Sequence, residues 1–305
     1  MAFTAKDVQA LRERTGCGMM DCKKALVECD GDMDKAVDFL REKGLASQAK
    51  KSTRVAAEGA VVVYSNNGVA AVVEANTETD FVASNDEFKA FVGEVAKIVA
   101  EQNPADVAAL LACKNEKGAT VEEMVQEVFL KFRENISIRR FIRYEGLVAS
   151  YVHAGGSIGV MVKFEAGADV AAKPEFAAMG KAVAMQIAAQ NPSYLDRASV
   201  PADVLAKEKE ILVAQMKEDP KMANKPEAVL HKIVDGKIGK YYSENCLLEQ
   251  AFVMDDSITV GKYIENTAKE LGGDIKAVEY VRFEKGEGIQ KREDNFADEV
   301  ASMAK

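Results

Sequence analysis

The sequence predicts an α+β protein in which a duplicated core follows a small all-helical unit. Three observations carry this prediction. Residues 1–45 show only helical periodicity, the rest of the chain alternates strand and helix patterns, and the order hairpin, helix, helix, strand occurs twice. Each copy is therefore expected to form a three-stranded antiparallel sheet backed by helices.

Residues 1–45 are expected to form three short helices. Thr4 can cap the first helix, the second helix runs from about Met20 to Glu28, and the third begins near Asp32. Gly44 is expected to end the third helix, because glycine readily takes the left-handed conformation that closes helices. A unit of this size has only a thin hydrophobic core.

Two β-hairpins open the two copies of the core. In the first, strands at about 60–64 and 69–76 flank the turn Asn66-Asn67-Gly68. In the second, strands at about 147–153 and 158–165 flank a glycine-rich turn. Each hairpin is followed by a long amphipathic helix, a second helix and a third strand.

Matching residue pairs show that the two copies correspond. Asn103-Pro104 corresponds to Asn191-Pro192, and Thr120-Val121 corresponds to Thr259-Val260. The interval between the two pairs is longer in the second copy, which therefore carries an insertion at 199–256. Its charged residues with spaced apolar ones indicate two antiparallel helices that form a projecting hairpin.

The expected organisation has six parts. In chain order they are a three-helix domain at 1–45, a polar linker at 46–57, a first core subdomain at 58–145, a second core subdomain at 146–198 and 257–285, the inserted helical hairpin at 199–256, and a C-terminal helix module at 286–305. The last part contains an amphipathic segment at 296–303, which is too short to be a stable helix unless it docks on something.

The composition indicates a reduced, cytoplasmic protein and disfavours several classes of partner. The chain has 305 residues and a net charge of −9, which argues against nucleic acid or an anionic membrane as the main partner. No apolar run approaches the ~20 residues that span a bilayer, and the N-terminus lacks the apolar core of a signal peptide. The five cysteines include no Cys-x-x-Cys pair, which predicts neither a disulfide framework nor a zinc site.

The sequence contains no recognisable motif for catalysis or cofactor binding. It lacks a Walker-type phosphate loop and a Gly-x-Gly-x-x-Gly segment after a strand. Only two histidines are present, His153 and His231, and neither has a catalytic companion in a recognisable context. We therefore expect no cofactor, no metal and no enzymatic activity, with an enzyme that uses His153 as the weaker alternative.

Asp80 and Phe81 are the most distinctive pair in the chain. They lie where an apolar strand passes into a helix, so their side chains can project from the packed body. A carboxylate beside a large aromatic ring suits an anchor that enters a partner's pocket. The alternative is that Phe81 only packs the first helical turn against the sheet. The second copy has Ala168 and Asp169 at the matching positions, so the fold does not require an aromatic anchor there, which favours a functional role.

Two segments resemble the signatures of the translation elongation factor Ts family. One runs from Leu11 to Leu26 (LRERTGCGMMDCKKAL) and the other from Glu78 to Ala83 (ETDFVA). Both signatures are specific, and their order and spacing agree with the family. The resemblance covers essentially the whole chain, and it implies a ubiquitin-associated-like N-terminal domain, the duplicated core, the inserted hairpin and the C-terminal helix.

The resemblance implies guanine-nucleotide exchange on the GTPase elongation factor Tu, which the protein would bind in both GDP-bound and nucleotide-free states. It implies that Asp80 and Phe81, flanked by Thr79 and Val82, enter a crevice of the GTP-binding domain. There the pair would shift a helix and disturb the magnesium site, so that GDP loses its metal-mediated hold. The exchange factor itself would need no bound nucleotide or metal.

The resemblance also implies partner contacts away from this pair. The N-terminal domain would grip the GTP-binding domain together with the C-terminal helix, through Arg12, Met19, Met20 and Lys23. His153 would contact another domain of the partner. An adaptor that binds a ubiquitin fold through residues 4–45 is a further alternative. The sequence leaves a homo-oligomer open, and no direct contact with nucleic acid or a membrane is expected.

Overall fold

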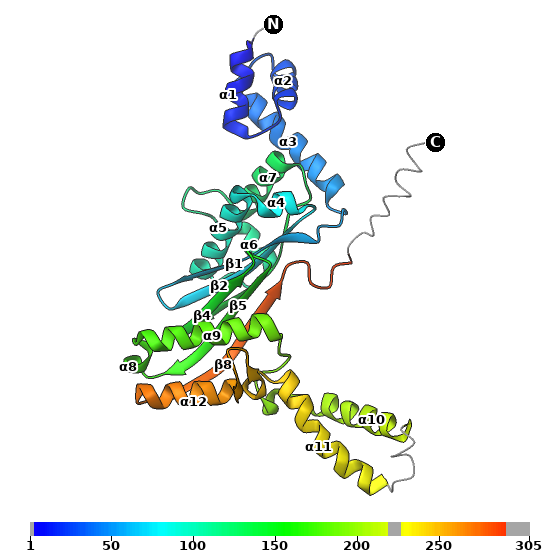
Figure 1. Cartoon of the computed structure of the whole chain (residues 1–305). Coiled ribbons are helices and arrows are strands. Elements are labelled where there is room, and N and C mark those ends of the chain that lie inside the picture. The colour runs from blue at the N-terminus through cyan, green and yellow to red at the C-terminus, as the bar shows by residue number, and fades with distance from the viewer. Residues whose placement is uncertain (1–2, 219–226, 291–305) are drawn as a thin grey trace. The chain divides into compact units, whose positions relative to one another are not determined.

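The structure, a computed structural model (Figure 1), describes residues 3–218 and 227–290. These residues form two compact units. The first unit holds the chain up to Arg143, together with Val152–Gly159 and the segment from Phe283 onward. The second holds Tyr144–Tyr151 and Val160–Arg282. Within the described ranges, no helix combines the length and apolar character needed to cross a membrane.

The first unit begins with the three expected helices. They are α1 (Ala5–Thr15), α2 (Met19–Glu28) and α3 (Met33–Lys51). The side chain of Asp32 caps α3 by accepting hydrogen bonds from the backbone N–H groups of Asp34 and Lys35. A small apolar core joins the three helices, and burial raises the pKa of the Cys22 thiol within it, so this thiol stays protonated at neutral pH.

The expected end of the third helix at Gly44 is wrong. Helix α3 continues to Lys51, so the first part of the segment expected to be a linker at 46–57 is helical. Gly44 lies inside the helix because α3 passes close to α7 (Val121–Phe132). A Cβ atom on Gly44 would lie 2.4 Å from Cδ2 of Leu130 on α7, so glycine permits the close approach of the two helices.

A matched pair of substitutions measures what this close approach requires. Gly93 lies in α5 (Asp86–Gln102), where a Cβ atom would have no neighbour within 4 Å. We expect Gly93→Ala to raise the free energy of unfolding by about 0.5–1 kcal/mol through helix propensity. Gly44→Ala is expected to lose this gain and lower stability by about 1–2 kcal/mol, because Leu130 must move. Urea denaturation of both variants checks the prediction, and an equal gain at both positions would contradict it.

The rest of the first unit is the first copy of the duplicated core. In chain order its elements are β1 (Glu58–Asn66), β2 (Val69–Thr77), α4 (Asp80–Ser84), α5, α6 (Val107–Ala112), α7 and β3 (Ser137–Glu145). The sheet order is β1-β2-β3, and β1 pairs antiparallel with β2 from Glu58 opposite Thr77 to Asn66 opposite Val69. Helix α5 packs on β1 and β2 through an apolar face that includes the fully buried Phe88.

The second copy repeats this order, which confirms the predicted duplication. Its elements are β4 (Leu147–His153), β5 (Ile158–Ala166), α8 (Ala168–Ala171), α9 (Pro174–Gln190), α12 (Val260–Leu271) and β8 (Ile275–Glu284). The sheet order is β4-β5-β8. The expected correspondences hold in detail, since Asn103 and Asn191 both end a long helix in the left-handed conformation, and Thr120 and Thr259 both cap the following helix.

The insertion in the second unit contains the predicted pair of helices and one further feature. Helices α10 (Ala202–Glu218) and α11 (Glu227–Asn245) pack on each other (Figure 1) through a small apolar cluster that includes Met216 and Val234. The helical hairpin is expected to extend to residue 256, but the chain leaves the α-helical conformation after α11. It forms the short 3-10 helix η2 (Leu247–Glu249) and then a two-stranded sheet of β6 (Ala251–Phe252) and β7 (Asp255–Thr259). Another 3-10 helix, η1 (Arg197–Ser199), precedes α10.

This small sheet also has a counterpart in the first copy. The pairing of Ala251 with Thr259 matches the isolated bridge between Lys114 and Thr120. It therefore belongs to the repeated core rather than to the insertion, and sequence reasoning missed it because the strands are very short. The expected C-terminal helix at 296–303 lies outside the described residues.

Candidate functional site

The corner between β2 and α4 presents the predicted acid–aromatic pair to solvent. Strand β2 ends at Thr77 and α4 begins at Asp80. The side chain of Phe81 is 85% exposed, and Asp80 is exposed beside it. The alternative in which the ring packs the first helical turn against the sheet is therefore wrong.

Local sequence explains why the ring points away from the protein. Thr79 is the N-cap of α4, and its hydroxyl oxygen accepts a hydrogen bond from the backbone N–H of Val82 at 3.4 Å. Val82 and Ala83 are the buried residues of this short helix, so they fix which face contacts the core. Phe81 lies on the face that the core does not cover, where its ring contributes little to folding.

The carboxylate of Glu134 holds the backbone immediately before this pair. Its Oε2 atom accepts hydrogen bonds from the backbone N–H groups of Glu78 (3.1 Å) and Thr79 (3.0 Å) and from the hydroxyl of Thr77 (2.7 Å). Its Oε1 atom accepts one from the hydroxyl of Thr79 at 2.6 Å. Four donors from three consecutive residues therefore converge on one carboxylate, and we call this arrangement the Glu134 clasp.

A second set of hydrogen bonds ties the clasp to the chain after α3. The backbone N–H of Asn135 donates to Oε1 of Glu78 at 2.6 Å. The side-chain amide of Asn135 donates to the carbonyl oxygens of Ser52 (3.2 Å) and Arg54 (2.7 Å). Arg54 also forms an ion pair with Glu78 at 3.4 Å. The corner that carries Phe81 is thus joined to the end of α7 and to the segment that follows α3.

The N-terminal residues predicted to contact a partner lie at the surface. Met19 is 42% exposed and Met20 is 64% exposed, both in the first turn of α2. Arg12 and Lys23 are also exposed, on α1 and α2. Two exposed methionines with nearby cations form an adaptable apolar surface of the kind that methionine supplies at binding sites.

The three-helix part is attached to the first core copy by specific contacts. Leu130 of α7 belongs to the apolar core of α1, α2 and α3. Arg133, which ends α7 with φ of 60°, forms an ion pair with Asp21 of α2 at 2.9 Å, and its carbonyl oxygen accepts a hydrogen bond from Lys51 of α3. The matching residue at the end of α12 is Gly272, so the arginine accepts an unfavourable backbone conformation where it makes these contacts.

His153 lies at the end of β4 and is exposed. Its carbonyl oxygen accepts hydrogen bonds from the backbone N–H groups of Gly156 (3.2 Å) and Ser157 (3.1 Å), which close the turn to β5. The same turn contacts β1, because Val61 donates its N–H to the carbonyl of Gly156 at 2.8 Å. Residues 152–159 are accordingly grouped with the first unit.

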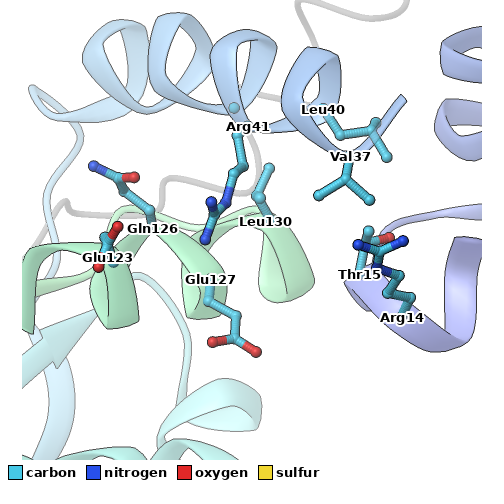
Figure 2. A pocket seen from close by; sticks show the side chains of 10 residues that line it. Arg14, Thr15, Val37, Leu40, Arg41, Glu123, Gln126, Glu127 and Leu130 are labelled. Atoms are coloured by element: carbon cyan, nitrogen blue, oxygen red, sulfur yellow. The ribbon is translucent and has the colours of Figure 1, made fainter. Parts of the chain in front are cut away.

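A cavity of about 320 Å³ lies between the three-helix part and α7 (Figure 2). Arg41 reaches from α3 towards α7 beside Leu130, and Glu123 and Glu127 of α7 contribute carboxylates (Figure 2). Among the described residues, none of those predicted to contact a partner lines this cavity. Asp80, Phe81, Arg12, Met19, Met20, Lys23 and His153 are exposed, which suits a protein partner more than a small molecule, whereas Thr79 is half-buried and Val82 is buried in the core.

Sequence reasoning identified the exposed pair but missed Glu134. A signal for it was available in the duplication. Helices α7 and α12 match residue for residue, and Glu134 then corresponds to Gly273. Thr79 corresponds to Gly167, which precedes α8 without a side-chain cap. The second copy therefore lacks the clasp at the same corner where it lacks the acid–aromatic pair.

Comparison with known proteins identifies the family of the chain. The family model for elongation factor Ts matches residues 78–287. The chain is 51% identical over 306 residues to elongation factor Ts of Clostridium perfringens (strain 13 / Type A), with 99% of each chain covered. It is 49% identical over 307 residues to that of Clostridioides difficile (strain 630), again with 99% of each covered, and 48% identical over 311 residues to that of Syntrophotalea carbinolica, with both chains fully covered. The chain therefore belongs to the elongation factor Ts family of translation factors.

Proposed function

We propose that this protein is a guanine-nucleotide exchange factor for elongation factor Tu, and that Asp80 and Phe81 act as a wedge at the partner's magnesium and nucleotide site. The single observation that carries the wedge is the 85% exposure of Phe81 at a corner whose backbone is fixed by the Glu134 clasp. A large ring held in water has no role in folding and is ready to fill a partner's pocket.

Exchange by this route follows from thermodynamic linkage. A protein that binds the nucleotide-free GTPase more tightly than the GDP-bound form must weaken GDP binding by the same factor. A wedge that fits only the distorted nucleotide site supplies this difference in affinity. The factor then acts without a nucleotide, metal or acid–base residue of its own, in the cytoplasm where its partner works.

The predicted residues of the N-terminal domain and His153 are assigned to binding rather than to displacement of the nucleotide, and Thr79 and Val82 are assigned to the support of the wedge. Arg12, Met19, Met20 and Lys23 would hold the GTP-binding domain, and their exposure on α1 and α2 supports this role. His153 would contact a second domain of the partner from the β4–β5 turn. Thr79 and Val82 flank the wedge, where Thr79 caps α4 and Val82 anchors it in the core.

Stopped-flow release of a fluorescent GDP analogue tests the proposal directly. Elongation factor Tu loaded with the analogue is mixed with excess unlabelled GDP, with and without this protein. We expect the release rate to rise with the concentration of this protein and then to saturate. A release rate that stays at its intrinsic value over the whole concentration range would contradict the proposed function.

The methionine pair on α2 is expected to contribute affinity. Met19→Ala with Met20→Ala should raise the half-saturating concentration about 5- to 30-fold, because each truncation removes apolar contact worth about 0.5–1 kcal/mol. The maximal release rate should change less than twofold. Val27→Ala is the matched control, since Val27 lies on the same helix and is 53% exposed. An equal effect of the control would show that α2 does not bind through the methionines.

A further inference from the structure

We infer that Glu134 is a positioning residue for nucleotide exchange, which acts by holding the Thr77–Thr79 backbone so that Phe81 is presented in one orientation. This inference rests on the proposed function of the Asp80–Phe81 wedge. The carboxylate of Glu134 binds the backbone and hydroxyl groups of residues 77–79, which precede the wedge. The inference therefore gives the clasp a role in function as well as in folding.

The geometry of the clasp fixes the orientation of the backbone that leads into the wedge. Two successive backbone N–H groups, those of Glu78 and Thr79, point to the same carboxylate oxygen at 3.1 and 3.0 Å. Such an arrangement fixes the backbone at both residues, and hydrogen bonds to a charged acceptor are stronger than neutral ones. Asp80 is the next residue in the chain, so the fixed backbone at Thr79 also sets the direction of the first turn of α4.

Glu134 lies outside α4, the helix that carries the wedge, and holds it from a separate part of the chain. It follows Arg133, the residue that ends α7, and precedes β3. Its carboxylate is therefore supported by a long helix and by a strand of the sheet β1-β2-β3. A rigid support of this kind lowers the conformational entropy that the wedge loses on binding.

The duplication provides an independent argument against a purely structural role. The second copy builds the same strand-to-helix corner, from β5 to α8, with Gly273 in place of Glu134 and Gly167 in place of Thr79. A Cβ atom on Gly273 would lie 2.6 Å from Cγ2 of Val170, so this position is filled by packing in the second copy. The fold can therefore close this corner without a carboxylate, and the clasp occurs only in the copy that carries the exposed aromatic ring.

The support reaches the N-terminal contact surface as well. Asn135, next to Glu134, binds the carbonyl oxygens of Ser52 and Arg54 just after α3. Arg133, on the other side, binds Asp21 of α2. One short segment between α7 and β3 thus fixes both the wedge and helix α2, which carries Met19 and Met20, and so preorganises two surfaces for one partner.

The inference is tested by the release assay with Glu134→Ala, alone and combined with Phe81→Ala. We expect Glu134→Ala to lower the maximal release rate about 10-fold and to change the half-saturating concentration less than threefold, because the N-terminal contacts remain. In the Phe81→Ala background, removal of the carboxylate should cost less than twofold more. Glu134→Gln, which keeps only one acceptor oxygen, should fall between wild type and Glu134→Ala.

Two further variants separate positioning from loss of stability. Thr259→Ala removes the hydroxyl that caps α12 by accepting from Lys262 N–H at 3.2 Å, in the second unit, and should lower the melting temperature without changing the release rate. Thr77→Val removes one hydroxyl donor to Glu134 while keeping the shape of a buried residue, and should lower the maximal rate two- to threefold. If Glu134→Ala does not fold, Thr77→Val still tests whether the clasp affects the release rate.

Hydrogen–deuterium exchange of the free protein tests the clasp without any partner. Glu134→Ala should raise the exchange rate of amides in residues 78–82 at least 10-fold, with unchanged protection in β5 and α9. Full release activity of a folded Glu134→Ala variant, or an equal loss in the Phe81→Ala background, would overturn the inference. If wild-type protein does not accelerate GDP release, the proposed function fails, and the amide exchange result still shows whether the clasp orders the corner.

Discussion

Phe81→Ala is expected to lower the maximal rate of GDP release from elongation factor Tu by about 30-fold or more. The ring is 85% exposed in the free protein, so its truncation removes contacts that exist only in the complex. Central aromatic anchors of interfaces cost about 2–4 kcal/mol when truncated, which corresponds to a factor of about 30 to 1000. The free energy of unfolding should stay within about 0.5 kcal/mol of the wild-type value, because an exposed side chain contributes little to the core.

Stopped-flow release of labelled GDP, together with urea denaturation, measures both parts of this expectation. Val253→Ala is a suitable control, since Val253 is 49% exposed in the turn between β6 and β7 and belongs to the second unit. The control should retain the wild-type release rate. A folded Phe81→Ala variant with a release rate within twofold of wild type would remove the ring from the mechanism.

The exposed pair could be predicted because the duplication allows two equivalent corners of the same chain to be compared. Asp80 and Phe81 differ from Ala168 and Asp169 at an equivalent corner, and the sequence alone shows this difference. The hairpins could also be predicted, because alternating apolar residues and the turn at Gly68 are local signals. Such signals depend only on neighbouring residues, so they can be recognised without knowledge of the fold.

Two of the features that sequence reasoning missed depend on residues far apart in the chain, and a third is too short to leave a pattern. Gly44 continues α3 because of a close approach to Leu130, and a local reading of glycine as a helix end could not show this. Glu134 accepts hydrogen bonds from residues 77–79, and a glutamate after a helix has no local signature of such contacts. The two-residue strand β6 is too short for any periodic pattern.

A second cluster of charges breaks the symmetry of the two copies, and it lies inside the first unit. Glu74 of β2 is fully buried, where the matching position of β5 holds Val162. Its carboxylate accepts hydrogen bonds from Arg139 (3.0 Å), from Arg140 and from the backbone N–H of Gly286 (2.8 Å). The guanidinium of Arg140 also lies 4.2 Å from the ring centroid of Phe283, so the cluster holds the chain after β8 against the first sheet.

Glu74→Val is expected to lower the free energy of unfolding by about 2–4 kcal/mol. The substitution leaves two guanidinium groups and the Gly286 N–H without their shared acceptor, and breaking a buried ion pair from one side typically costs 3–5 kcal/mol. The expected cost is about 1 kcal/mol smaller than for a fully buried pair, because the side chains of Arg139 and Arg140 are 29% and 30% exposed and water can partly hydrate them. Urea denaturation gives the value directly.

Removing the whole cluster should be far less harmful than removing its centre. In the variant with Glu74→Val, Arg139→Val and Arg140→Leu no buried charge is left unpaired, and apolar replacements of buried ionic groups are often neutral or stabilising. The second copy already has valine at two of these positions, Val162 and Val278, which shows that the fold accepts such packing. We expect the triple variant to recover at least half of the stability that Glu74→Val loses. A triple variant less stable than the single one would mean that the arginines stabilise the sheet independently of Glu74.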